Sequence, residues 1–233
     1  AITLSGSGAA LSITVDNGNS LNVQAALTTN AGNITLSADN DVIFTAAGDL
    51  TSNNGSISVT ADDDSTSDAN SGGALTMADG TVFDAGSGTI SATSDEDLTV
   101  GQMTTTNATT SAITLNSKSG NILDGGDTGG DDLTAASGTI VVSSGGTFGT
   151  TTNGIERTSA GLNTSGVTTS LEDETASSTL AGTSETVGDA SVDQTINIVE
   201  DLAKSVEKNN QVPVGGSSST VSLGIDPSPS GSG

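Results

Sequence analysis

A short apolar triplet headed by isoleucine recurs six times in the first 150 residues, and this repeat constrains the fold more than any other feature of the sequence. Its members are Ile13-Thr14-Val15, Ile34-Thr35-Leu36, Ile57-Ser58-Val59, Ile90-Ser91-Ala92, Ile113-Thr114-Leu115 and Ile140-Val141-Val142. The intervals are 21, 23, 33, 23 and 27 residues, and the longest one contains a polar insert at residues 62–70. A period of 20 to 30 residues with short strands is typical of a solenoid, in which each coil buries its apolar face against the next.

The residues around each triplet supply the rest of a coil. Glycine stands two residues before the isoleucine in four repeats, and a second apolar pair follows about eight to ten residues after the triplet. These pairs are Leu21/Val23, Val42/Phe44, Leu98/Val100 and, as a single residue, Ile122. Apolar and polar residues alternate within each segment, as a strand with one buried face requires. We expect the three phenylalanines, Phe44, Phe83 and Phe148, to stack inside.

The sequence therefore predicts an all-β protein, a parallel β-helix with coils of about 21–27 residues. An antiparallel β-sandwich is the alternative, because it also gives many short strands at regular spacing. We expect the solenoid to span residues 1–175, followed by a polar linker at 176–190. A helical apolar stripe predicts an amphipathic helix at 191–210. The tail at 211–233 is rich in glycine, serine and proline, with an alternating segment at 220–225 that can add as a strand.

Composition excludes several functional classes. The chain has 28 acidic and 4 basic residues, for a net charge of -24, so it would repel nucleic acid and anionic membranes. No apolar run is long enough to cross a membrane. Histidine and cysteine are absent, which removes imidazole and thiolate chemistry. We expect no enzyme and no catalytic residue. The chain begins at Ala1 without a basic and apolar leader, so we expect a mature secreted chain or a fragment.

Acidic turns are the only candidate binding sites in the sequence. Residues 126–133 resemble the G-G-x-G-x-D-x-U calcium nonapeptide, with Asp127 in place of the second glycine. Carboxylate oxygens suit Ca²⁺, so one interpretation is a Ca²⁺ site formed by Asp124, Asp127, Asp131 and Asp132. In the other interpretation these turns bind no cofactor, and together with Asp39/Asp41, Asp62–Asp64, Asp68 and Asp95/Glu96/Asp97 they keep the protein soluble.

Three segments carry a family resemblance. Residues 33–38, residues 86–102 with their Gly-Ser-Gly-Thr-Ile and Asp-Leu-Thr-Val-Gly-Gln runs, and residues 120–127 resemble the repeats of filamentous-haemagglutinin-like adhesins and other large bacterial exoproteins. The resemblance covers roughly residues 1–170. It implies a right-handed parallel β-helix, export from the cell, and an adhesive or scaffolding role at the cell surface.

From these observations we expect a secreted bacterial structural protein, a subunit of an extracellular fibre or surface matrix. Residues 1–4 read as a strand at an open solenoid edge, which favours head-to-tail contact between copies. We expect Ile2, Leu4, Val221, Leu223 and Ile225 to mediate this self-assembly. The alternative function is an adhesin stalk, stabilised by Ca²⁺, whose receptor the sequence does not specify.

Overall fold

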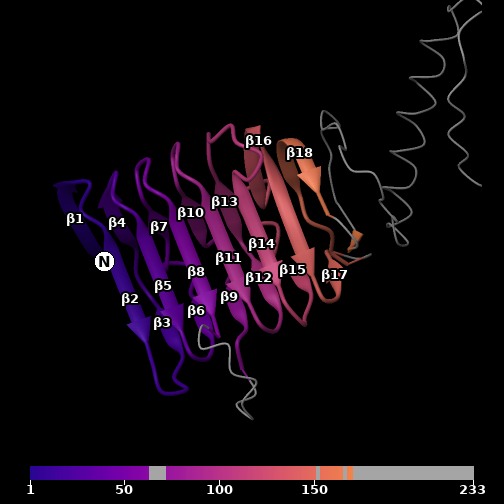
Figure 1. Ribbon diagram of the computed structural model, residues 1–233, viewed down its shortest axis with the longest axis horizontal. Coiled ribbons are helices and arrows are strands. Elements are labelled where there is room, and N and C mark those ends of the chain that lie inside the picture. Colours follow the sequence, from indigo (N-terminus) through magenta and orange to yellow (C-terminus); the bar gives the residue numbers. More distant parts are fainter. Residues whose placement is uncertain (63–71, 151–152, 165–166, 170–233) are drawn as a thin grey trace, which may run out of the picture. The chain divides into compact units, whose positions relative to one another are not determined.

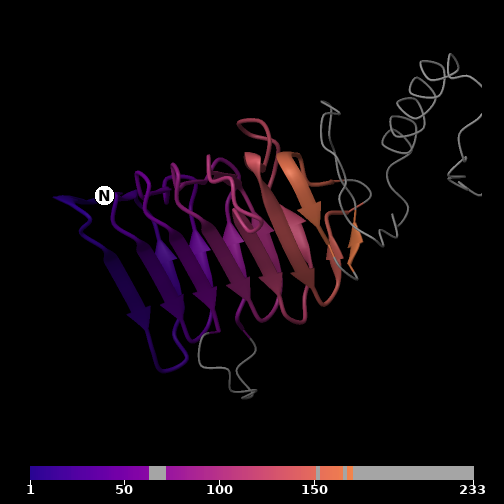
Figure 2. The same cartoon turned by 45° about the horizontal axis from the view of Figure 1, so that its top comes forward.

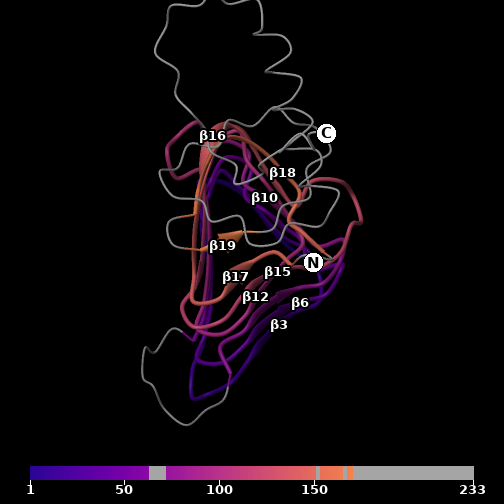
Figure 3. The same cartoon turned by 90° about the vertical axis from the view of Figure 1, so that its right-hand side faces the viewer.

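The computed structural model describes residues 1–62, 72–150, 153–164 and 167–169, and this part of the chain is a β-solenoid of about seven turns (Figure 1). Viewed end-on, the coils superimpose around one narrow interior (Figure 3). The strands form three faces, named here the A, B and C faces. All pairings between these strands are parallel. The all-β parallel solenoid is thereby confirmed, and the antiparallel sandwich is excluded.

Each face is a row of short strands, one from each coil. The A face contains β1 (Ile2–Ser7), β4 (Leu27–Asn30), β7 (Leu50–Thr51), β10 (Val82–Asp84) and β13 (Gln102–Thr104). The B face contains β2 (Leu11–Val15), β5 (Ile34–Ala38), β8 (Ile57–Ala61), β11 (Ile90–Ser94) and β14 (Ile113–Ser117). The C face contains β3 (Leu21–Val23), β6 (Val42–Phe44), β9 (Leu75–Met77), β12 (Leu98–Val100), β15 (Ile122–Asp124), β17 (Thr147–Phe148) and β19 (Thr168–Thr169). Two longer strands, β16 (Leu133–Ser144) and β18 (Arg157–Asn163), run from the A face onto the B face and pair with each other (Figure 2).

The isoleucine repeat is the inward column of the B face. Ile34, Ile57, Ile90, Ile113 and Ile140 pair in that order from coil to coil, and all are at most 1% exposed. The polar insert lies between β8 and β9 and leaves this register intact.

One member of the predicted repeat is misaligned. The residue that pairs with Ile34 is Leu11, while Ile13 pairs with Leu36. Side chains alternate between faces with a period of two, so a slip of two residues keeps the same side chains inward and cannot be detected from alternation alone.

Glycine precedes the B face because the coils approach most closely at this corner. A Cβ atom added to Gly55 would lie 2.2 Å from the carbonyl oxygen of Gly32, and one added to Gly88 would lie 2.0 Å from the carbonyl oxygen of Gly55. The equivalent atom on Gly32 would meet the Ala9 carbonyl. The Gly-x-Ile motif therefore marks the corner itself.

The isoleucine repeat in the sequence did not predict the strands of the A face. Its strands carry one large inward side chain, followed two residues later by a small one such as Thr29, Ser52 or Thr105. These buried hydroxyls donate to corner carbonyls, as Ser52 Oγ does to Gly55 O at 2.5 Å. A strand with so little apolar content gives a weak periodic signal.

The interior is a continuous column of aliphatic and aromatic side chains. Phe44, Phe83 and Phe148 are all buried, as predicted. Phe44 and Phe83 pack edge to face with their ring centroids 4.8 Å apart, whereas Phe148 stacks on Ile122 of the C face.

The described residues form strands and turns and contain no helix. Within those ranges no helix has the length and apolar character needed to cross a membrane. The predicted linker at 176–190, helix at 191–210 and tail at 211–233 lie outside the described residues.

Candidate metal centre

Two long connections lead from the C face to the A face in consecutive coils. Gly101 alone joins β12 to β13, whereas residues 125–132 join β15 to β16 and residues 149–156 join β17 to β18. Asp124 is the last residue of β15, before the first connection, and Asp132 and Glu156 are the last residues of the two connections. We call these three residues the carboxylate cluster.

Asp124 occupies a position that is apolar in the preceding coils. It ends β15 and pairs with Val100, which continues the inward column of Met77, Phe44 and Val23. Unlike those four buried residues, Asp124 is half-buried. This one column of the interior therefore changes from apolar to acidic at this coil.

Asp132 and Glu156 occupy equivalent positions in consecutive coils. Each precedes the first residue of a strand, and those two residues, Leu133 and Arg157, are paired. The Leu133 backbone N–H donates to the Glu156 carbonyl at 3.1 Å, which holds the two positions together. One carboxylate oxygen from each member of the cluster lies within 4.8 Å of the others.

Asp132 is the most enclosed member of the cluster. Its side chain is fully buried, and neither of its carboxylate oxygens has a hydrogen bond of normal geometry among the described residues. Burial, followed by the negative charges of Asp124 and Glu156, raises the pKa of Asp132 from 3.8 to about 9. Contact with the Glu156 side chain raises the pKa of Asp132 further, whereas contact with the Glu156 backbone lowers it. At neutral pH the carboxyl group of Asp132 thus retains a proton unless a cation takes its place.

A buried arginine extends the polar interior beyond the cluster. Arg157 stacks on Leu133 in the A-face column and is only 2% exposed. Its Nη1 donates to Ser159 Oγ at 2.8 Å. The influences that set the pKa of Asp132 come from burial, Asp124 and Glu156.

The structure separates the four acids of the predicted Ca²⁺ site. It brings Asp124 and Asp132 together, while Asp127 is exposed at the tip of the connection. Asp131 accepts a hydrogen bond from Thr158 Oγ1 at 2.5 Å. Sequence reasoning missed Glu156, which lies 24 residues after Asp132, and the coil period is the signal that links them.

Other acidic turns bind the backbone of the following coil. Asp41 Oδ1 accepts the backbone N–H groups of Gly73 and Ala74 at 3.0 and 3.1 Å. Asp97 Oδ1 accepts the Asn121 N–H at 2.7 Å. These carboxylates therefore join coils to one another, besides contributing negative charge to the surface. Asp63, Asp64 and Asp68 lie outside the described residues.

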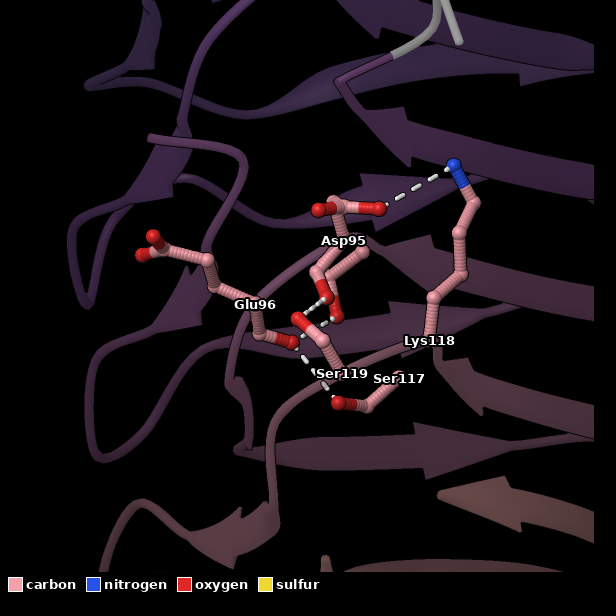
Figure 4. A network of polar contacts seen from close by, with 6 residues as sticks. Asp95, Glu96, Ser117, Lys118 and Ser119 are labelled. Carbon is pink, nitrogen blue, oxygen red and sulfur yellow. Dashed lines mark hydrogen bonds and ion pairs between the residues drawn. The ribbon is translucent and has the colours of Figure 1, made fainter. Parts of the chain in front are cut away.

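The turn at Asp95 and Glu96 shows such a junction in detail (Figure 4). Lys118 Nζ lies 3.5 Å from Asp95 Oδ1. Ser119 Oγ donates to the Asp95 carbonyl at 2.5 Å, and Ser117 Oγ donates to the Glu96 carbonyl at 2.7 Å. This acidic turn is a contact between coils.

The N-terminal coil forms one edge of each face. β1, β2 and β3 each have a strand partner on one side only among the described residues. Ile2 is 47% exposed, and Leu4 is half-buried. The remaining predicted assembly residues, Val221, Leu223 and Ile225, lie outside the described residues.

Comparisons of the chain with protein-family models, with curated proteins and with solved structures find no match.

Proposed function

We propose that this chain is a secreted structural protein, a subunit of an extracellular fibre or surface matrix in which a second copy stacks on the N-terminal coil. One observation carries the proposal, the partial exposure of that coil. Leu11 and Ile13 are half-buried, whereas Ile34 and Leu36, their partners in the next coil, are fully buried. Another coil of the same construction would cover the N-terminal positions in the same way.

The open edge also presents backbone hydrogen-bonding groups. The Leu11 N–H and the Val15 carbonyl bond to the following coil, with Asn33 O and Asp39 N as their partners. Adjacent residues of a strand direct these groups to opposite sides. Ser12 and Thr14 therefore direct theirs to the open edge, which is a template for another strand. The resemblance of the repeats to those of bacterial exoproteins supports the extracellular location.

Replacing Ser12 tests the edge directly. Proline at an edge position removes one outward N–H and leaves the bonds to the next coil in place. We expect electron microscopy to show ordered filaments of the purified wild-type protein and of Ser12→Ala. The molar mass of both, measured by light scattering, should increase with protein concentration. Ser12→Pro should remain monomeric with an unchanged far-UV circular dichroism spectrum. Equal filament formation by both variants would show that this edge is not the joint.

The second candidate is an adhesin stalk stabilised by Ca²⁺, which the carboxylate cluster favours. A stalk within a longer polypeptide needs no contact between copies. Short monomeric rods of the wild-type protein at every concentration would therefore favour the stalk over the fibre.

A further inference from the structure

We propose that Asp124, Asp132 and Glu156 form a binding site for one divalent cation with hard-oxygen preference, and that this cation is Ca²⁺. The inference is drawn from the geometry of the site and stands whether or not copies of the chain assemble. It replaces the set of four aspartates read from the sequence with three acids contributed by two successive coils.

The burial of Asp132 is the observation that points to a ligand. Its carboxyl group is fully enclosed, faces two other carboxylates, and receives no hydrogen bond of normal geometry among the described residues. Enclosing a carboxylate is costly unless an opposite charge or hydrogen bonds compensate it. The pKa of Asp132 reflects the same crowding. A cation placed between the three groups would remove both the desolvation cost and the mutual repulsion.

The spacing of the oxygens suits Ca²⁺. Ca²⁺ binds oxygen at about 2.4 Å, so two ligands on opposite sides of the ion are separated by about 4.8 Å. The oxygens of the cluster lie within 4.8 Å of one another, so every pair of them meets this upper limit for ligands of one ion. Ca²⁺ also accepts six to eight oxygens in irregular geometry, with water completing the shell, which suits a site at a corner where Asp124 and Glu156 retain some exposure.

Calorimetric titration of CaCl₂ into the metal-stripped full-length chain tests the site. Asp132→Asn removes a ligand charge at constant side-chain shape. Asp127→Asn removes the same charge from the exposed tip of the same connection and is the matched control. We expect one Ca²⁺ per chain in the wild type and in Asp127→Asn. In Asp132→Asn the Kd should rise about ten-fold or more, since even outer-shell partners of metal ligands are worth that much. Glu156→Gln should behave like Asp132→Asn.

Thermal unfolding supplies an independent readout. Ca²⁺ should raise the Tm of the wild type and of Asp127→Asn above its value in NaCl of equal ionic strength, and should raise the Tm of Asp132→Asn clearly less at the same Ca²⁺ concentration. Circular dichroism checks that each variant folds. Absence of binding by the wild type at millimolar Ca²⁺ would overturn the proposal. Binding of one Ca²⁺ by Asp132→Asn with an unchanged Kd would also overturn the proposal, because the ion would then bind outside the carboxylate cluster.

Discussion

Within the solenoid, an inward residue of the B face pairs with its equivalents in the coil before and the coil after. The interior is only a few side chains wide, so a polar side chain introduced into a column has no route to solvent. Ile113 has Ile90 on one side and Ile140 on the other. Its neighbour Thr114 lies on the outer surface of the same strand and is half-buried.

Ile113→Asp should destabilise the protein strongly, whereas Thr114→Asp should not. The first places a carboxylate in a fully buried column and should cost about 4 kcal/mol or more in the free energy of unfolding. The second adds a charge at an outward position and should cost less than about 1 kcal/mol. Urea unfolding followed by circular dichroism measures both, and similar losses would mean that the B-face register is wrong.

At the scale of single elements, the corners decide how closely the coils approach. The corner before the B face is a ladder of backbone contacts, in which Gly32, Gly55 and Gly88 are stacked with no space for a Cβ atom. Along the strands, serine, threonine and alanine alternate with larger residues.

Gly55→Ala should therefore be destabilising although the change is small. Its Cβ would lie 2.2 Å from a backbone oxygen of Gly32, so two coils must separate, at a cost of about 3 kcal/mol. Gly6→Ala is the control, because its Cβ would meet only Ala9 Cβ at an ordinary 3.6 Å. A comparison of Tm values decides the matter: equal shifts in the two variants would argue against close packing at this corner.

The elements that the sequence predicted are those with a strong local signal. The B and C faces each carry two or three apolar residues in alternation, so the triplets and the following pairs could be located. The A face carries one large side chain and a buried hydroxyl whose partner, such as Gly55 O for Ser52, is known only once the corner is folded. The carboxylate cluster was half predicted for the same reason. Asp124 and Asp132 flank the same connection, whereas Glu156 reaches the cluster only through the stacking of coils.

At the scale of the whole molecule, the enclosed Asp132 links folding to pH. The folded protein retains a proton on this group up to about pH 9, while the unfolded chain releases it near pH 3.8. Between these values the folded state binds more protons, so the contribution of Asp132 to stability is greatest at low pH. It decreases as pH rises, by at most about 1.4 kcal/mol per pH unit.

We therefore expect the free energy of unfolding, measured in a chelator, to fall more steeply with rising pH between 5 and 8.5 in the wild type than in Asp132→Asn. The amide cannot titrate, so the difference in slope reports Asp132 together with its interaction with Asp124 and Glu156, apart from the remaining acids. Parallel slopes in the two proteins would mean that Asp132 is ionised in the fold.

The coils differ in length, yet the strands remain in register. More residues separate β8 from β9, and β15 from β16, than separate the equivalent strands of other coils, yet β9 and β16 still pair in parallel with strands of neighbouring coils. A gene that duplicated or lost one whole coil would thus encode a rod about 4.8 Å longer or shorter with the same cross-section. The length of such a rod can evolve by unequal recombination between repeats. The rod can become longer or shorter without any substitution of its inward residues.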